Sequence, residues 1–277
     1  MTVKIVTDSV SDIPSDLAKQ LDITMVPLTV NFGVESFLDG VEITPKEFFE
    51  KIETAPSLPT TAAPSIGAFT EVYKDLTGKG HEVVSLHVSG KLSATLSSAT
   101  QAAAELGNEH ISVVDTQAVS AMEALIVTAA ARVAIAGGSV EEVIEKAKSS
   151  IDKTAVYVVL DTLEYLQKGG RIGRAAALMG GLLSIKPILT LNDGEVHPHE
   201  KVRTRAKALA RIIEIVQSGG PYEEITVMHA SAEDEAEYLT SVLEPMCSDL
   251  PILSSQIGPV VGTHAGPGSV AVATRTI

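Results

Sequence analysis

The chain has 277 residues, 45% hydrophobic and 20% charged, a composition typical of a folded globular protein long enough for two domains. Aromatic residues make up 4% and the formal net charge is −14, which excludes a broad nucleic-acid surface and disfavours an anionic membrane surface. A single cysteine, Cys247, excludes a disulfide framework, and we expect it to be a packing residue.

The N-terminus predicts no signal peptide, because residues 1–9 enter a strand without a basic segment followed by an apolar one. The longest apolar stretches, 118–136 and 175–191, are interrupted by charged residues and predict no membrane span. We therefore expect a cytoplasmic protein without an integral membrane segment.

Strand and helix patterns alternate through the first half of the chain, which predicts a parallel α/β sheet. Pro14 marks one helix start, and Thr44 with Glu47 forms a capping box at another. Strands are expected at 3–7, 23–30, 82–88 and 111–115, and helices at 12–21, from 44 onward, and at 65–77, 93–106, 120–136 and 139–151. Residues 55–65 are expected to form a loop.

The second half predicts a mixed sheet, because the turn Asn192-Asp193-Gly194 between two apolar runs indicates an antiparallel hairpin. Strands are expected at 155–160, 185–191, 195–200, 224–229, 252–257 and 269–274, and helices ending at 168 and spanning 203–217 and 232–246. We expect the domain boundary within 137–151, which gives an N-terminal domain of residues 1–150 and a C-terminal domain of residues 151–277.

No familiar catalytic or nucleotide-binding motif is present. The glycine-rich segment 169–174 follows a predicted helix rather than a strand, which argues against a dinucleotide fingerprint. A phosphate-binding GxxxxGK[ST] loop and a GxSxG elbow are absent from the sequence. The seven histidines show no zinc-ligand spacing, so we expect no metal site.

Hydroxyl-rich and glycine-rich turns stand out instead, at 8–9, 59–65, 89–98 and 258–268. Turns that follow parallel strands gather at the carboxyl edge of the sheet, where ligands of α/β folds bind. Free N–H groups and hydroxyls at the helix start near Ser93 favour an anion, and His264 beside Thr61 and Ser93 would help to neutralise a carboxylate. Each turn taken alone is also explained as a helix cap or a tight turn.

Several motifs together closely resemble the DegV family. They are Asp8-Ser9 with Asp12-Ile13, the Pro-Thr-Thr…Pro-Ser loop at 59–65, Leu-Ser…Leu-Ser-Ser-Ala at 92–99, Val114-Asp115-Thr116, the segment 163–174, Lys186-Pro187-Ile188 and Gly262-Thr263-His264. The resemblance runs from residue 5 to about residue 273. It implies two α/β domains, with a parallel Rossmann-like N-terminal sheet and a mixed-sheet C-terminal domain, and a lipid site between them.

The resemblance also implies a function. Members of the family bind long-chain fatty acids, and in some bacteria they are the acyl-carrying subunit of a fatty-acid kinase. This implies a carrier rather than an enzyme, with a bound fatty acid, no other cofactor, and an ATP-binding kinase subunit as the partner to which the acyl carboxylate is presented.

Carried over to this sequence, the resemblance implies hydroxyl donors at Thr61 and Ser93 for the carboxylate, and a backbone N–H donor at Ala94. His264 is implied as a nearby partner, and Arg171 as a support of the head-group network. The chain has Ala62-Ala63, where the family often has Ser-Gln, and 94–98 also departs from the usual Gly-Thr-Tyr-Gln-Ser. These departures bear on the shape of the tail site and on the head-group contacts.

The segment Leu178-Met179-Gly180-Gly181-Leu182-Leu183 is expected to form either part of the tail wall or ordinary core. Basic residues cluster within 168–174 and 201–211, which indicates a docking face for an acidic partner or phosphate, or a solvated helix face. The resemblance favours kinase docking through Arg174 and Arg203.

Two other functions stay open. A serine-dependent acyl hydrolase or transferase would use Ser93 as nucleophile, His264 as base and Asp115 as orienter, although Ser93 lies at a helix start without a strained elbow. A lipid-sensing adaptor would share the pocket of the carrier.

Overall fold

A computed structural model describes residues 2–107, 109–179, 186–247 and 251–277 of the chain. Its helices are α1 (Ser15–Gln20), α2 (Pro45–Thr54), α3 (Ile66–Gly78), α4 (Thr95–Leu106), α5 (Ala121–Ile135), α6 (Val140–Lys153), α7 (Glu164–Lys168), α8 (Arg205–Gly219), α9 (Glu233–Leu243) and α10 (Pro259–Ala265). Three short 3-10 helices are η1 (Ser9–Ser11), η2 (Gly173–Leu178) and η3 (Glu244–Met246).

The N-terminal half contains a parallel sheet, as predicted. Its strand order is β2-β1-β6-β7, formed by Ile23–Val26, Val3–Asp8, Glu82–His87 and Ile111–Asp115. The predicted capping box of α2 is present, with the amide of Thr44 donating to Glu47 Oε2 over 2.8 Å.

The C-terminal half contains a six-stranded mixed sheet, again as predicted. Its strand order is β10-β9-β8-β13-β11-β12, formed by Glu195–Glu200, Ile188–Asn192, Thr154–Val159, Val270–Thr276, Tyr222–His229 and Leu253–Gln256. The hairpin predicted at Asn192-Asp193-Gly194 joins β9 and β10 in antiparallel pairing. Cys247 is partly buried against the core of this half, in agreement with its predicted packing role.

A third, three-stranded sheet was not expected. The predicted strand at 23–30 is two strands, because Pro27 has no N–H to continue the ladder of β2. The second, β3 (Thr29–Phe32), pairs with β4 (Glu35–Leu38) and with β5 (Thr60–Ala62). The expectation of a plain loop at 55–65 was therefore wrong, since β5 lies within it.

The expectation of a loop at 258–268 was also wrong, because α10 forms there. Gly258 is its N-cap residue, Pro259 occupies its first position, and Gly266 ends it with φ of 75°. The proline and the terminal glycine fit the usual helix boundaries. The glycine within the helix, Gly262, weakens the helical pattern in the sequence, and the helix is held by packing instead.

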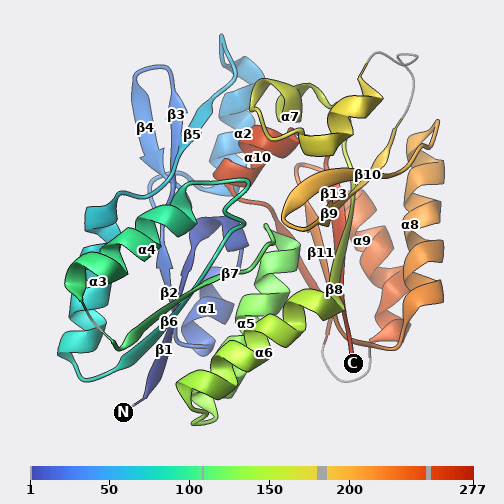
Figure 1. Ribbon diagram of the computed structural model, residues 1–277. Coiled ribbons are helices and arrows are strands. Elements are labelled where there is room, and N and C mark those ends of the chain that lie inside the picture. The colour runs from blue at the N-terminus through green and yellow to red at the C-terminus, as the bar shows by residue number, and fades with distance from the viewer. Residues whose placement is uncertain (1, 108, 180–185, 248–250) are drawn as a thin grey trace.

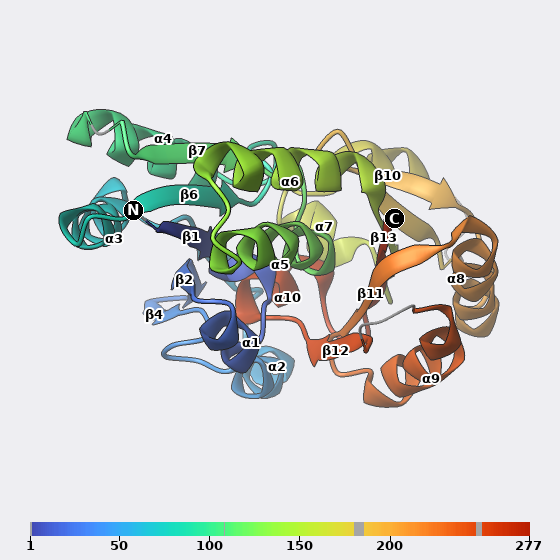
Figure 2. The same cartoon turned by 90° about the horizontal axis from the view of Figure 1, so that it is seen from below.

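Helix α5 lies between the two large sheets and is buried on nearly all sides (Figures 1 and 2). It contacts β1 of the parallel sheet and β8, β11 and β13 of the mixed sheet. One hydrophobic cluster therefore includes residues of both halves, such as Ile5 on β1 and Met228 on β11. The predicted boundary between residues 150 and 151 falls within α6, and the division into domains 1–150 and 151–277 stays a prediction.

Candidate functional site

A cavity lies between the two large sheets. It is lined by 26 residues, of which 19 are Val, Leu, Ile, Met or Ala. Its volume, measured as the space that the centre of a water molecule can occupy, is about 140 Å³. On the same measure, one water needs roughly 10–15 Å³. Because protein interiors hold few voids larger than one water, a cavity of this size and composition indicates a binding site for an apolar molecule.

The floor of the cavity is a row of apolar side chains across the mixed sheet. Leu189 on β9 pairs with Val158 on β8, which pairs with Ala271 on β13, which pairs with Met228 on β11. Residues directly opposite in antiparallel strands point to the same face, and all four line the cavity. Strands are about 4.8 Å apart, so the row is roughly 14 Å long.

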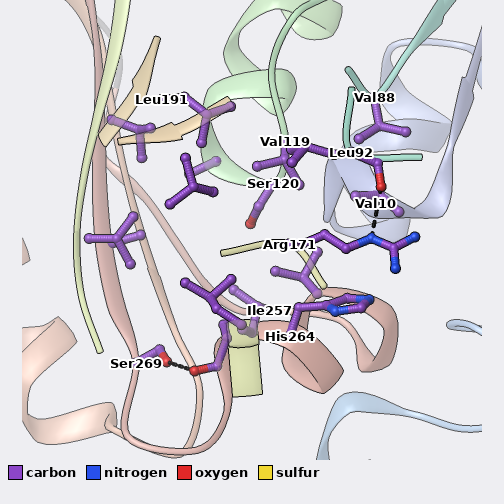
Figure 3. A pocket seen from close by; sticks show the side chains of 18 of the residues that line it. Val10, Val88, Leu92, Val119, Ser120, Arg171, Leu191, Ile257, His264 and Ser269 are labelled. Carbon is purple, nitrogen blue, oxygen red and sulfur yellow. Dashed lines mark hydrogen bonds between the residues drawn. The ribbon is translucent and has the colours of Figure 1, made fainter. Parts of the chain in front are cut away.

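The polar end of the cavity is its more open end. Thr61 on β5, Ser93 before α4, Arg171 after α7 and His264 on α10 all line the cavity and are partly exposed. Figure 3 shows Arg171 and His264 on one side of the cavity, with Leu191 across from them. The structure thus brings together four residues that the sequence distributes over about two hundred positions.

The apolar end is closed. It is formed by residues with exposed fractions of 4% or less, and they belong to the cluster shared by the two halves: Ala121, Val156, Met228 and Ile257. A ligand in this cavity therefore has a buried apolar part and a polar part near solvent.

Thr61 and His264 are in direct contact, with 3.0 Å between Thr61 Oγ1 and His264 Nε2. Burial, and then the positive charge of Arg171, lower the pKa of His264 to about 4, so the imidazole is neutral near pH 7. Its Nδ1 atom is buried and has no hydrogen-bond partner within the described residues. Gly169 permits this close packing, because a Cβ there would lie 2.2 Å from Nδ1.

The side chain of Arg171 is hydrogen-bonded to the turn that carries Ser93. Its Nε donates to the carbonyl oxygen of Leu92 over 3.0 Å (Figure 3). Its Nη1 donates to the carbonyl oxygen of Gly169 over 2.8 Å. These bonds hold the guanidinium at the cavity while its charge stays available to an anion.

Ser93 also has a local structural contact. Its Oγ accepts from the amide of Thr95 over 3.2 Å and lies 2.8 Å from Thr95 Oγ1. Ala94 follows directly, is exposed, and does not line the cavity with its side chain. Within the described chain, its amide has no hydrogen-bond acceptor, which leaves a free donor at the start of α4.

Arg174 and Arg203 do not line the cavity, and both are exposed. Arg174 pairs weakly with Glu195, with 3.5 Å between Nε and Oε2. Of the segment expected to form the tail wall, Leu178 is buried in a cluster with Leu189, Met179 is exposed, and residues 180–183 lie outside the described residues.

Ser120 is a lining residue that the sequence reasoning missed. It adopts φ of 54°, which the sequence does not signal, and its hydroxyl donates to Asp12 Oδ2 over 2.5 Å. Asp12 stood within a recognised motif, but its place beside the cavity depends on the contact between η1 and the start of α5.

The serine-hydrolase alternative requires a hydrogen bond between Ser93 and His264, and the described residues do not form it. Ser93 Oγ bonds to Thr95 and His264 bonds to Thr61, while Asp115 accepts from the amides of Gly90 and Gln117. The triad that this alternative requires is therefore not assembled in the described structure.

A different serine–histidine–aspartate chain does exist in the N-terminal half. Ser85 Oγ lies 2.7 Å from His87 Nε2, and His87 Nδ1 lies 2.9 Å from Asp8 Oδ2. All three residues are fully buried, and none lines the cavity. Because all three side chains are buried away from the cavity, we interpret this hydrogen-bond network as structural. Asp8 also accepts from the amides of Val10 and Val88, which both line the cavity.

In the described ranges, we find no helix with the length and apolarity that a membrane span requires. The same ranges contain no group of three or more histidine, cysteine, aspartate or glutamate side chains that could hold a metal ion.

Comparisons with known proteins identify what the chain resembles. A family profile described as an uncharacterised protein, DegV family, matches residues 2–276. A DegV domain-containing protein of Streptomyces coelicolor is 39% identical over 98% of this chain and 97% of its own length. Protein DegV of Bacillus subtilis is 35% identical over 98% of each chain.

Solved structures are similar over the whole fold. A DegV family protein from Thermus thermophilus, described as binding fatty acid, has a TM-score of 0.91 and 36% identity, with full coverage of both chains. DegV from Bacillus subtilis, described as a fatty acid binding protein, has a TM-score of 0.89 and 33% identity over 99% of each chain.

Proposed function

The chain belongs to the DegV family, and on that premise we propose that it binds a long-chain fatty acid, with the tail in the apolar cavity and the carboxylate at the polar end. The observation that carries the proposal is the cavity itself, which is closed and apolar at one end and polar and partly exposed at the other. The similar proteins of Thermus thermophilus and Bacillus subtilis, described as fatty acid binding, support the same ligand class.

Most of the affinity would come from the tail. Burial of about 15 methylenes contributes roughly 12 kcal/mol before association costs, at about 0.8 kcal/mol per CH₂. Hydrogen bonds to a charged carboxylate add about 1.5–3 kcal/mol each. The polar end then selects the head group, since an unpaired carboxylate there would be costly.

The tautomer of His264 supports a donor role for Thr61. A proton on the unpartnered Nδ1 would be an orphaned buried donor, which is rarer in proteins than an orphaned acceptor. The proton therefore belongs on Nε2, which donates to Thr61 Oγ1 and leaves the Thr61 hydroxyl hydrogen free. In the proposed complex this hydrogen, the Ser93 hydroxyl and the free amide of Ala94 bond the carboxylate, and Arg171 supplies the positive charge.

Native mass spectrometry of protein purified from cells tests the proposal. We expect a bound species with the mass of a long-chain fatty acid, or uptake of added palmitate or oleate after delipidation. Protein that carries no acid and takes up neither compound would contradict the proposal.

We propose further that the protein has no catalytic step of its own and presents the carboxylate to a separate ATP-binding kinase subunit, which forms the acyl phosphate. Partial exposure of the four polar residues supports access to the carboxylate from outside. The exposed Arg174 and Arg203 are the residues that we assign to docking of this subunit.

A coupled assay with the purified chain, oleate, ATP and a candidate kinase subunit tests this step. ADP should form only when all four are present. Arg174→Ala with Arg203→Ala should slow ADP formation without changing oleate affinity, while Lys19→Ala, at an exposed site on α1, should change neither. ADP formation at the wild-type rate in the double variant would refute the docking role, and a partner that binds without using ATP would favour the lipid-sensing adaptor.

A further inference from the structure

Helix α10 belongs in sequence to the C-terminal half but packs into the N-terminal half. It connects β12 with β13, and it contacts α2, β3, β5 and η1 of the N-terminal half as well as α7 of its own half (Figure 1). Four of its residues, Val260, Val261, His264 and Ala265, line the cavity. A displacement of α10 would therefore open the cavity and remove the partner of Thr61 at once.

Three glycines spaced four residues apart give α10 its close fit. A Cβ at Gly262 would lie 2.7 Å from Phe48 Cε1, and one at Gly266 would lie 2.4 Å from Tyr165 Cδ2. At the other end, a Cβ at Gly258 would lie 2.7 Å from Asp12 Oδ1 and 3.1 Å from Asp39 Oδ1. Aromatic rings hold the middle and the C-terminal end of the helix, and two carboxyl groups hold its N-terminal end.

The two carboxyl groups interact with the first turn of α10. The amide of Gly258 donates to Asp12 Oδ1 over 2.8 Å, and the backbone amide of Val260 lowers the pKa of Asp39. Ser120, which lines the cavity, donates to Asp12 over 2.5 Å, and Ser9, which precedes the lining residue Val10, donates to Asp39 over 2.9 Å.

We propose that Asp12 and Asp39 are positioning residues for the bound fatty acid, which hold α10 against the N-terminal half most firmly when the pair carries a proton. The proposal rests on the proposed function, because the ligand is the one assigned there. Asp12 and Asp39 themselves do not line the cavity; they act through α10 and Ser120.

The surroundings of the pair favour the protonated form. Burial raises the pKa of Asp39 to about 7, and burial also raises the pKa of Asp12 well above its ordinary value. The charge of Asp8 raises both values, and Glu123 on α5 is a further acidic neighbour of Asp12. The donors Ser9 and Ser120 and the two α10 amides act in the opposite direction, and His87 is bonded to Asp8.

The sign of the pH dependence follows from these pKa values. When α10 leaves, the pKa of Asp39 returns toward its ordinary value of 3.8, whereas it is about 7 with the helix in place. The docked state binds more protons between these values, so docking weakens as the pH rises from about 4 to about 7 and changes little above that. From pH 6 to pH 8, Asp39 alone weakens docking about tenfold.

Hydrogen exchange in the ligand-free protein is the first arm of the test. After correction for the intrinsic exchange rate, amides of residues 257–266 should open about tenfold more often at pH 8 than at pH 6. Amides of β13 serve as the internal reference and should show a smaller change. The second arm is the dissociation rate of cis-parinaric acid, a fluorescent fatty acid, which should rise by a similar factor.

Variants separate the carboxyl pair from general pH effects. Asp39→Asn should remove most of the difference between pH 6 and pH 8 in both arms, and Asp75→Asn, at an exposed carboxyl group on α3, should retain it. Ser9→Ala removes a bond that lowers the pKa of Asp39, so it should move the transition to higher pH.

Equal opening of α10 at pH 6 and pH 8 in the wild type would overturn the proposal, as would an unchanged pH profile in Asp39→Asn. If Asp39→Asn does not fold, the wild type and Ser9→Ala decide by the same criteria. The exchange arm needs no ligand, so a failure of cis-parinaric acid to bind would count against the proposed function alone.

Discussion

The contacts with neighbouring residues determine what each polar side chain of the site can do, as seen for Thr61, Ser93 and His264. A hydroxyl on a surface strand is common, but Thr61 lies 3.0 Å from a neutral imidazole that has no other hydrogen-bond partner in the described chain. In the proposed complex, this contact orients the Thr61 hydroxyl and leaves its hydrogen for the carboxylate. Ser93 combines two positions: its hydroxyl bonds Thr95 at the start of α4, and its side chain also lines the cavity.

The double substitution Thr61→Ala with Ser93→Ala tests this interpretation. Loss of two hydrogen bonds to a charged carboxylate should weaken binding by at least about tenfold, since each is worth about 1.5–3 kcal/mol. The melting temperature of the ligand-free protein should change little, because among the described residues the Ser93 hydroxyl bonds only Thr95 and the Thr61 hydroxyl bonds only His264. Titration with a fluorescent fatty acid measures the first effect and calorimetry the second.

Ser97→Ala is the matched control, since Ser97 is an exposed hydroxyl on α4 that does not line the cavity. It should retain wild-type affinity. A double variant that binds as tightly as the wild type would refute the donor roles, and a collapse of its fold would show that the two residues are structural caps.

Among the elements, α10 and β5 decide the site, and both lie in segments that the sequence indicates as loops. Helix α10 consists largely of proline, valine, glycine and threonine, which are weak helix formers, and β5 is only three residues long. The elements form because β3 offers an edge to β5 and because Phe48, Phe49 and Tyr165 accept the glycine face of α10. Tertiary contacts outweigh local preference in both segments.

Gly262→Ala tests the role of the close fit. The new methyl group would lie 2.7 Å from Phe48 Cε1 and 2.8 Å from Phe49 Cζ, and overpacking of this kind costs about 1–3 kcal/mol. We expect α10 to shift, fatty-acid affinity to fall, and the melting temperature to decrease.

Gly78→Ala on α3 is the control, because a Cβ there meets no atom within 4 Å. It should leave affinity unchanged and keep or raise the melting temperature, since alanine favours a helix over glycine. If both variants bind equally well, the position of α10 does not matter for the ligand.

For the whole molecule, the shared core around α5 predicts cooperative unfolding. Residues of both large sheets belong to one hydrophobic cluster, and Arg132 of α5 forms a two-point ion pair with Glu224 of β11, at 3.0 and 2.9 Å. Neither half can lose its fold without exposing apolar surface of the other.

Scanning calorimetry should therefore record one main transition, which a bound fatty acid moves to higher temperature because it binds only the folded state. Two well-separated transitions in the ligand-free protein would show that the halves are independent units.

The sequence alone determined the class and order of most elements. Strand β7 has the predicted bounds, and the capping box of α2 and the hairpin of β9 and β10 formed as expected. These features rest on interactions between residues that are close in the chain. The resemblance of the motifs to a known family indicated the ligand class, and it placed Thr61, Ser93, Arg171 and His264 together before their geometry was known.

The tertiary structure decided what depends on distant residues. The contact of Thr61 with His264 joins positions 203 residues apart, and that of Gly258 with Asp12 joins positions 246 apart. The closed end of the cavity, the unusual backbone of Ser120 and the docking of α10 likewise arise from packing between the two halves. Local pattern records which face of an element is apolar, but not which distant element will cover it, so the cavity is a property of the assembled fold.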